Sequence, residues 1–193
     1  MHTLSTSFVL GYHGCDAKVA ERLLAGDDFR LSQNDYAWLG HGVYFWEANP
    51  KRGIEFAGEL KNSGRRPDIT TPAVVGAVID FGKCLDLTKS AGTQQAASAY
   101  NTYKGICKKS GTSLPRNSKD SLRRNLDCAV IQTLHEIMKT ADLAPVDFVK
   151  GVLAEVAPAY PGSDIYKQTH IQICVKNPDF IKGVFCVPKQ YLE

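Results

Sequence analysis

The last third of the chain constrains the fold most, because three strand-like segments follow one another there without a helix between them. These segments are residues 148–156, 169–175 and 181–187, separated by turns at 158–162 and 177–179. Strands joined by short turns pair antiparallel, whereas parallel strands need a longer and usually helical connection. The pattern therefore predicts an α+β fold and excludes a doubly wound α/β sheet.

The rest of the chain mixes shorter strand-like and helix-like segments. Short apolar or alternating segments predict strands, and apolar residues at helical spacing predict helices. Strands are expected over residues 8–13, 28–32, 42–46 and 73–87, the last one interrupted at Gly82. Helices are expected from Asp16 to Gly26, from Pro50 to Leu60, over 88–109 and over 122–138. We expect one domain, with a helical insertion at about 88–140.

The composition is that of an ordinary globular protein, with 44% hydrophobic and 22% charged residues among 193. No apolar run approaches the roughly 20 residues that a membrane-spanning helix needs. No basic region precedes the first apolar run, so we expect no signal peptide, no membrane partner and a cytoplasmic location. The cysteines stand singly without a CxxC pair, which disfavours a metal site and favours free thiols. Four of them are expected to be buried: Cys84, Cys128, Cys174 and Cys186.

Two short motifs near the N-terminus carry the chemistry. His13-Gly14 ends the first expected strand, and Gly40-His41-Gly42-Val43-Tyr44-Phe45 begins the third. A glycine beside the histidine gives a planar ligand access to the backbone, and its peptide groups can pair with a carboxamide. The second motif projects an aromatic ring that can stack on such a ligand. We expect His13 and Tyr44 to face one concavity.

These motifs resemble the ADP-ribosyltransferase fold, in the branch of diphtheria toxin and the poly(ADP-ribose) polymerases. That branch carries a His-Gly pair on its first strand, then a G-x-G-[IV]-Y-F segment, and a glutamate on a late strand. The resemblance covers residues 12–56 well and the C-terminal strands loosely, whereas residues 61–145 match no motif of the family. It implies a single domain over residues 1–193, built on a split antiparallel sheet with flanking helices, and NAD as co-substrate.

The resemblance also implies roles for individual residues. His13 would bond the ribose next to nicotinamide, and Gly14 would hold the carboxamide through its backbone. Tyr44 and Phe56 would sandwich the nicotinamide ring, although the family usually has tyrosine where Phe56 stands. Arg30 would lie against the diphosphate or the adenosine. The full set of expected NAD-binding residues is His13, Gly14, Arg30, Ser32, Tyr44, Phe45 and Phe56.

The third element departs from the family, because Gln172 stands where the glutamate is expected. Glutamine can bond a ribose hydroxyl, but it cannot accept a proton or balance positive charge on the sugar. Either the acceptor is an intrinsically good nucleophile, or a carboxylate such as Glu155 or Glu47 substitutes, or the protein turns NAD over poorly. The expected catalytic set is His13, Tyr44, Gln172 and Glu155.

The resemblance therefore implies an NAD-dependent ADP-ribosyltransferase of the bacterial toxin, effector or defence type, with nicotinamide as leaving group. An NAD glycohydrolase and a catalytically silent module that binds NAD or ADP-ribose remain as alternatives, and a neutralising antitoxin stays open as a partner. The acceptor is protein or nucleic acid, with a slight preference for protein because the net charge is only +3. Against that preference, Tyr100, Tyr103 and seven basic residues lie around one loop: Lys104, Lys108, Lys109, Arg116, Lys119, Arg123 and Arg124.

Overall fold

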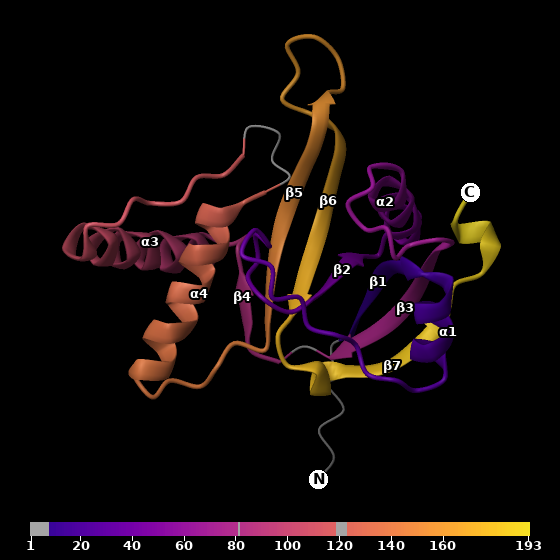
Figure 1. Ribbon diagram of the computed structural model, residues 1–193, viewed down its shortest axis with the longest axis horizontal. Helices are drawn as coiled ribbons and strands as arrows, with labels where there is room; N and C mark the ends of the chain where they lie inside the picture. Colours follow the sequence, from indigo (N-terminus) through magenta and orange to yellow (C-terminus); the bar gives the residue numbers. More distant parts are fainter. Residues whose placement is uncertain (1–7, 81, 119–122) are drawn as a thin grey trace. The chain divides into compact units, whose positions relative to one another are not determined.

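The computed structural model describes residues 8–80, 82–118 and 123–193 (Figure 1). In this part of the chain it shows four α-helices and mixed, mostly antiparallel strands, which confirms the predicted α+β class. The chain divides into two compact units. Unit 1 comprises Met1–Arg30, Tyr44–Gly82 and Asn177–Glu193, and unit 2 comprises Leu31–Val43 and Lys83–Lys176.

The strands of unit 1 follow the order β2-β1-β3-β7, and all neighbours are antiparallel. Their bounds are β1 (Phe8–Asp16), β2 (Val43–Glu47), β3 (Pro72–Asp80) and β7 (Ile181–Cys186). The last strand was expected to pair with the one before it, but β7 pairs with β3. One reason is the connection, in which residues 178–180 form a 3₁₀ turn rather than a hairpin. The other is that Gly76 of β3 has no side chain, so the Phe185 ring of β7 can pack directly on its backbone.

Two helices cover opposite faces of β1 and β3. α1 (Ala17–Leu24) packs Ala20 and Leu23 against Cys15 and Val75. α2 (Pro50–Asn62) packs its Gly53 against Gly14 of β1 and Val74 of β3. Neighbouring residues along a strand point to opposite faces, so the two helices lie on different sides of these strands.

The start of α1 is fixed by Asp16, the residue at which this helix was expected to begin. One carboxylate oxygen accepts from the backbone N–H of Lys18, and the other accepts from the N–H groups of Thr70 and Thr71. Hydrogen bonds from the Thr71 and Lys18 N–H groups hold the pKa of this carboxyl well below its usual range. The same side chain therefore caps the helix and fastens the loop that leads into β3.

Unit 2 contains β4 (Cys84–Asp86), β5 (Phe148–Pro158) and β6 (Tyr166–Val175). β5 and β6 are antiparallel, as predicted, whereas β4 and β5 are parallel. The connection between the parallel strands holds α3 (Ser90–Ser110) and α4 (Asn125–Thr140), which pack against each other. The segment that we expected as a helical insertion is therefore the crossover that a parallel pair needs.

Several local expectations change. Residues 28–32 form no strand; only Ser32 pairs with Gly42 as an isolated bridge, while Phe29 packs on the His13 and Phe45 rings. The segment 73–87 is divided between β3 and β4, and the helix expected from residue 122 begins at Asn125, residue 122 itself lying outside the described residues. All six cysteines are free; Cys186 is exposed and Cys84 half-buried, because each stands on a strand at the edge of its unit, so for these two the burial prediction is wrong. No helix in the described part of the chain is long and apolar enough to cross a membrane.

Candidate functional site

β1 and β2 separate beside His13. Their register covers two pairs in the described chain, Gly11↔Glu47 and Tyr12↔Trp46. At the next position His13 Nδ1 lies 2.9 Å from the Tyr44 carbonyl oxygen. A carbonyl oxygen only accepts, so Nδ1 carries the hydrogen and donates it, and Nε2 is left as an acceptor. The imidazole thus takes the place of a ladder hydrogen bond where the strands part.

The surroundings of His13 keep the imidazole neutral. Its ring centroid lies 5.4 Å from that of Phe29 and 5.8 Å from that of Phe45. Burial lowers the pKa of His13, the hydrogen bond to Tyr44 partly opposes that shift, and the positive charge of Arg66 adds to it. At neutral pH the side chain therefore presents an uncharged acceptor nitrogen.

The peptide groups of Gly14 point to the side from which β2 has departed. The Leu10 carbonyl accepts from Ala48 N–H beyond the end of β2, and backbone direction alternates along a strand, so Leu10, Tyr12 and Gly14 all point to that side. The described pairing with β2 ends at Tyr12. The N–H and C=O of Gly14 consequently point toward the stretch of β2 with which β1 no longer pairs. A carboxamide placed there can form the complementary pair of hydrogen bonds.

The missing side chain of Gly14 has a different cause from the one expected. We expected the absent Cβ to admit a planar ligand. Instead, a Cβ at Gly14 would overlap the carbonyl oxygen of Gly53 in α2. Glycine is therefore required by the close packing of α2 on β1, and only its peptide groups remain for a ligand.

The Tyr44 side chain does not share a face with the His13 imidazole. Continuing the register places Tyr44 opposite Gly14 and Phe45 opposite His13, and opposed residues share a face. The expectation that His13 and Tyr44 face one concavity is therefore not met. The two residues meet at the strand edge instead, through the Tyr44 carbonyl, so a ligand that contacts both has to lie across that edge.

The other residues expected around NAD in unit 1 lie in different surroundings. Phe45 is 1% exposed and packs in the core. The Phe56 ring lies 5.5 Å from the Trp46 ring and 5.4 Å from the guanidinium of Arg52, a buried side chain that bonds Glu59 at 2.9 and 3.0 Å. Phe56 thus belongs to a packed stack.

The segment expected near the diphosphate is divided between the units. Arg30 is exposed at the end of a segment of unit 1, whereas Ser32 belongs to unit 2 and accepts from Asn34 N–H at 3.4 Å. Glu47 stands opposite Gly11 and thus on the face of His13.

In unit 2, Gln172 is buried and held by Trp38, which was not among the expected site residues. The side chain of Gln172 is 6% exposed, and its Oε1 accepts from Trp38 Nε1 at 2.7 Å. The Trp38 ring covers Gly151, which stands opposite Gln172 in the β5–β6 register. The only available signal was an isolated Trp-Leu pair in an otherwise polar loop.

Glu155 shares a face of the β5–β6 pair with Gln172. Gly151, Leu153 and Glu155 alternate along β5, opposite Gln172, His170 and Gln168 of β6. Glu155 Oε2 lies 3.7 Å from His170 Nε2, with the two side chains 22% and 10% exposed. This face therefore carries a carboxylate–imidazole pair beside the glutamine. His170 was missed, although its spacing of two residues from Gln172 predicts a common face.

The glycines of the second motif serve close packing within unit 2. A Cβ at Gly40 would meet Gln132 and Ile131 of α4, and a Cβ at Gly42 would meet Cys174 and the Val175 carbonyl of β6. The motif is thus split between the units, with Gly40–Val43 in unit 2 and Tyr44-Phe45 in unit 1.

The hydrogen bond between Trp38 and Gln172 gives a stability prediction. Trp38→Phe should lower the free energy of unfolding by about 1–3 kcal/mol, because it leaves a buried amide oxygen without its donor. Urea unfolding measures this. Adding Gln172→Leu should recover much of the loss, since removing both polar partners is nearly neutral. A double variant less stable than the single one would contradict the assigned role of this bond.

Comparisons with known proteins place the chain in a family. No family model matches the chain, and no solved structure matches it. A relative, "Uncharacterized protein MJ0359" of Methanocaldococcus jannaschii, is 47% identical over 190 residues. The alignment covers 89% of this chain and 83% of the archaeal protein. The chain therefore belongs to the same family as MJ0359.

Proposed function

We propose that the protein is an NAD-dependent ADP-ribosyltransferase that transfers ADP-ribose to a macromolecule and releases nicotinamide. One observation carries the proposal: a neutral imidazole, held by the Tyr44 carbonyl, stands beside the outward-facing peptide of Gly14. Nicotinamide riboside has the complementary groups, since its carboxamide pairs with a peptide and its ribose hydroxyl donates to His13 Nε2. The proposal takes residues 1–193 as a single domain of the split-sheet type, with the toxin, effector or defence role that the resemblance implies.

The reaction sets the tasks of the remaining residues. The bond between the nicotinamide nitrogen and the ribose carbon breaks, its electron pair leaves with nicotinamide, and the acceptor bonds to that carbon and loses a proton. His13 and Gly14 orient the riboside, and the Tyr44 carbonyl holds the His13 imidazole in place; this positioning accounts for part of the rate. Gln172 bonds a ribose hydroxyl and does not take the proton.

We assign the proton to Glu155 rather than to Glu47. Glu155 shares its face with Gln172, which stands at the position of the family's glutamate, and it has His170 at 3.7 Å to hold or pass on a proton. The low exposure of both side chains supports this role, because a partly buried pair excludes bulk water from the transferred proton.

The deciding experiment incubates the purified protein with NAD labelled in the adenylate, with and without cell lysate. Release of nicotinamide together with label on macromolecules is the expected result, and protease and nuclease digestion then identify the acceptor. Nicotinamide release without labelled macromolecules would instead establish a glycohydrolase. NAD binding without release would establish a silent module, and absence of NAD binding would overturn the proposal altogether.

The pH dependence of NAD binding, measured by titration at each pH, tests the neutral state of His13. Protonation of Nε2 removes the acceptor for the ribose hydroxyl, and burial lowers the pKa of His13 below its ordinary value of 6.5. The affinity for NAD should therefore stay constant as the pH falls from 8 to 6.5 and decline only below that. A decline centred above pH 6.5 would contradict the assigned state.

The variant His13→Asn separates the two nitrogens. Asparagine can still donate to the Tyr44 carbonyl from the position of Nδ1, but it has no atom at the position of Nε2. The dissociation constant for NAD should rise about fivefold, the equivalent of one hydrogen bond of about 1 kcal/mol. The urea midpoint should stay within error of the wild type. Isothermal titration with NAD makes the measurement, and an unchanged affinity would remove His13 from the site.

A further inference from the structure

A hollow of about 380 Å³ lies between α3 and α4 of unit 2, and the proposed NAD site does not account for it. Trp38 lines it together with Ala96, Ala97 and Tyr100 of α3 and Arg124 and Asp127 at the start of α4. The two alanines leave space that larger side chains would fill. The hollow thus combines two aromatic rings with one cation and one carboxylate.

Aliphatic side chains complete the lining: Leu87, Leu126, Val130 and Ile131. The two aromatic rings add flat surfaces on which a heterocycle can stack. Aromatic rings stack on any nucleobase, because every base has a π face. The Arg124 guanidinium lies 5.1 Å from the Trp38 ring centroid, where it can also meet a phosphate. The carboxylate of Asp127 can accept from an exocyclic amino group, the contact that carboxylates make with cytosine.

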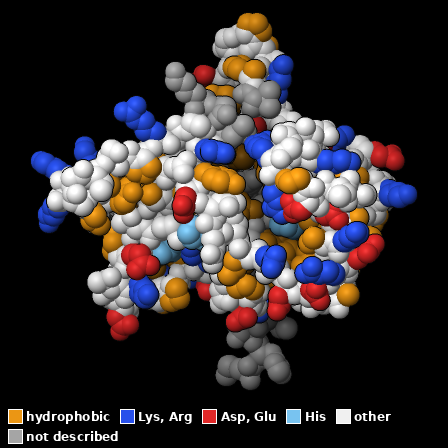
Figure 2. Space-filling view, viewed as in Figure 1, with side chains coloured by type: hydrophobic (Ala, Val, Ile, Leu, Met, Phe, Trp, Pro, Cys, Tyr) orange, Lys and Arg blue, Asp and Glu red, His pale blue; other side chains and the backbone are white. Residues whose placement is uncertain are grey.

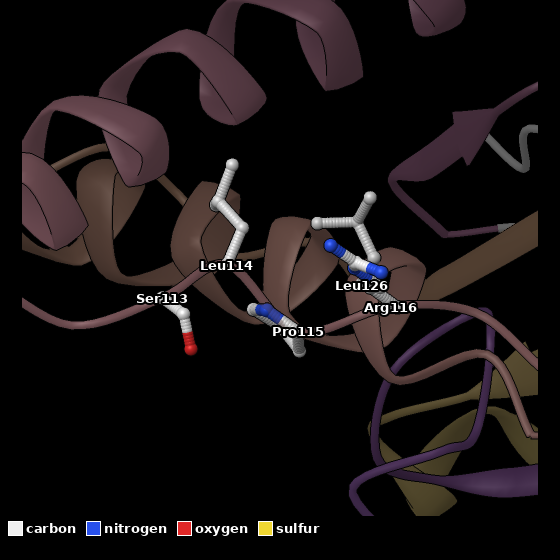
Figure 3. Close-up of a pocket in the computed structure, with 5 residues that line it drawn as sticks. All are labelled: Ser113, Leu114, Pro115, Arg116 and Leu126. Carbon is white, nitrogen blue, oxygen red and sulfur yellow. The ribbon is translucent and has the colours of Figure 1, made fainter.

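The surroundings of the hollow are basic. A second hollow of about 620 Å³ shares Leu126 with the first and is lined by Leu114 and Arg116 (Figure 3). In Figure 3 the Leu114 and Ser113 side chains point to opposite sides.

Arg123 lies 5.7 Å over the Tyr36 ring, which makes a second stack of cation and aromatic ring. Figure 2 shows further Lys and Arg side chains gathered over the end of α3, at the left. The net charge is only +3, so this positive charge is a local feature that complements a phosphodiester chain.

One residue that lines the hollow also bonds the glutamine of the proposed site. The same Trp38 that lines the hollow donates through Nε1 to Gln172. Because Trp38 covers Gly151 on the face of β5 and β6 that also carries Gln172 and Glu155, a base stacked against Trp38 lies over that face of unit 2.

We propose that this hollow binds an unpaired base of single-stranded nucleic acid, and that this base is the acceptor of ADP-ribose. The inference rests on the proposed function. An amino nitrogen of the base forms the bond to the ribose carbon, nicotinamide leaves with the electron pair of the broken bond, and the amino proton passes to Glu155. A nitrogen nucleophile also suits a site with glutamine at the glutamate position. The slight sequence-based preference for protein is thereby reversed.

Binding is tested first, without NAD, so that the result does not depend on catalysis. The probe is a fluorescein-labelled single-stranded oligonucleotide of mixed sequence, as DNA and as RNA, followed by fluorescence anisotropy. Tyr100→Leu keeps an apolar side chain but removes the π face, and should weaken binding about tenfold. Tyr100→Phe keeps the ring and should bind like the wild type. Annealing the complementary strand should abolish the interaction, because the bases are then no longer accessible.

The salt dependence tests the basic surroundings. Replacing Arg116 or Arg123 by alanine should weaken binding and reduce the slope of log K against log salt by about 0.7 for each lost phosphate contact. The matched control is Lys139→Ala, which removes one charge from α4 about 22 Å along the helix from Arg124. This control should leave both the affinity and the slope unchanged.

Two results would overturn the inference. One is equal oligonucleotide binding by Tyr100→Leu and the wild type. The other is transfer of label from NAD to lysate proteins but not to the oligonucleotide, which would leave the proposed function intact. Conversely, wild-type oligonucleotide binding without any release of nicotinamide would support the binding site while refuting the proposed function.

Discussion

Replacing Glu155 by glutamine should lower the rate of ADP-ribose transfer by roughly 10²- to 10⁴-fold, the usual contribution of a general base. The physical reason is that Gln172 cannot take the proton that the acceptor loses. Glu155 lies on the same face of β5 and β6, with His170 Nε2 at 3.7 Å from its Oε2. The affinity for NAD should stay unchanged, because Glu155 is not among the residues assigned to NAD. Single-turnover transfer and NAD titration measure the two quantities separately.

A rescue variant makes this prediction specific. Adding Gln172→Glu to Glu155→Gln returns a carboxylate to the same face, and Trp38 Nε1 remains able to donate to it. Part of the lost rate should therefore return. The control Glu136→Gln removes an exposed carboxylate of α4 and should not affect transfer. An undiminished rate in Glu155→Gln would exclude Glu155 and leave Glu47, on the face of His13, as the next carboxylate to replace.

The features that the sequence predicts correctly are those with local causes. Asp16 caps α1 because its carboxylate reaches the N–H of Lys18, two residues away. α2 begins at Pro50 behind an asparagine cap, and β5 and β6 pair antiparallel because a short turn joins them. Each of these outcomes depends on contacts between residues close in sequence, which a pattern of residue types can express.

The features that the sequence does not predict depend on how distant segments pair and pack against each other. Trp38 and Gln172 are 134 residues apart, and nothing in either neighbourhood predicts their hydrogen bond. β7 pairs with β3 and not with β6, the strand that precedes it in the sequence, so its partner is distant along the chain. The opposite faces of His13 and Tyr44 likewise follow from the register of β1 and β2, since a shift of one residue would reverse them.

Gly14→Ala should lower the free energy of unfolding by about 3 kcal/mol, the upper part of the usual range for overpacking. The new methyl group would meet the Gly53 carbonyl oxygen, which belongs to the backbone of α2 and has no rotamer with which to yield. α2 would have to move away from β1. The edge at Gly14 would be distorted as well, so NAD binding should weaken in the same variant. Urea unfolding and NAD titration test the two effects.

Gly58→Ala is the matched control, because it adds the same methyl group to the same helix. A Cβ at Gly58 meets no atom within 4 Å, and the position lies inside α2. Alanine there should raise the stability by about 0.5–1 kcal/mol, since it restricts the unfolded chain more than glycine does. Opposite signs for the two variants would establish that Gly14 is required for the approach of α2. A Gly14→Ala protein as stable as the wild type would mean that α2 does not lie against β1 as closely as described.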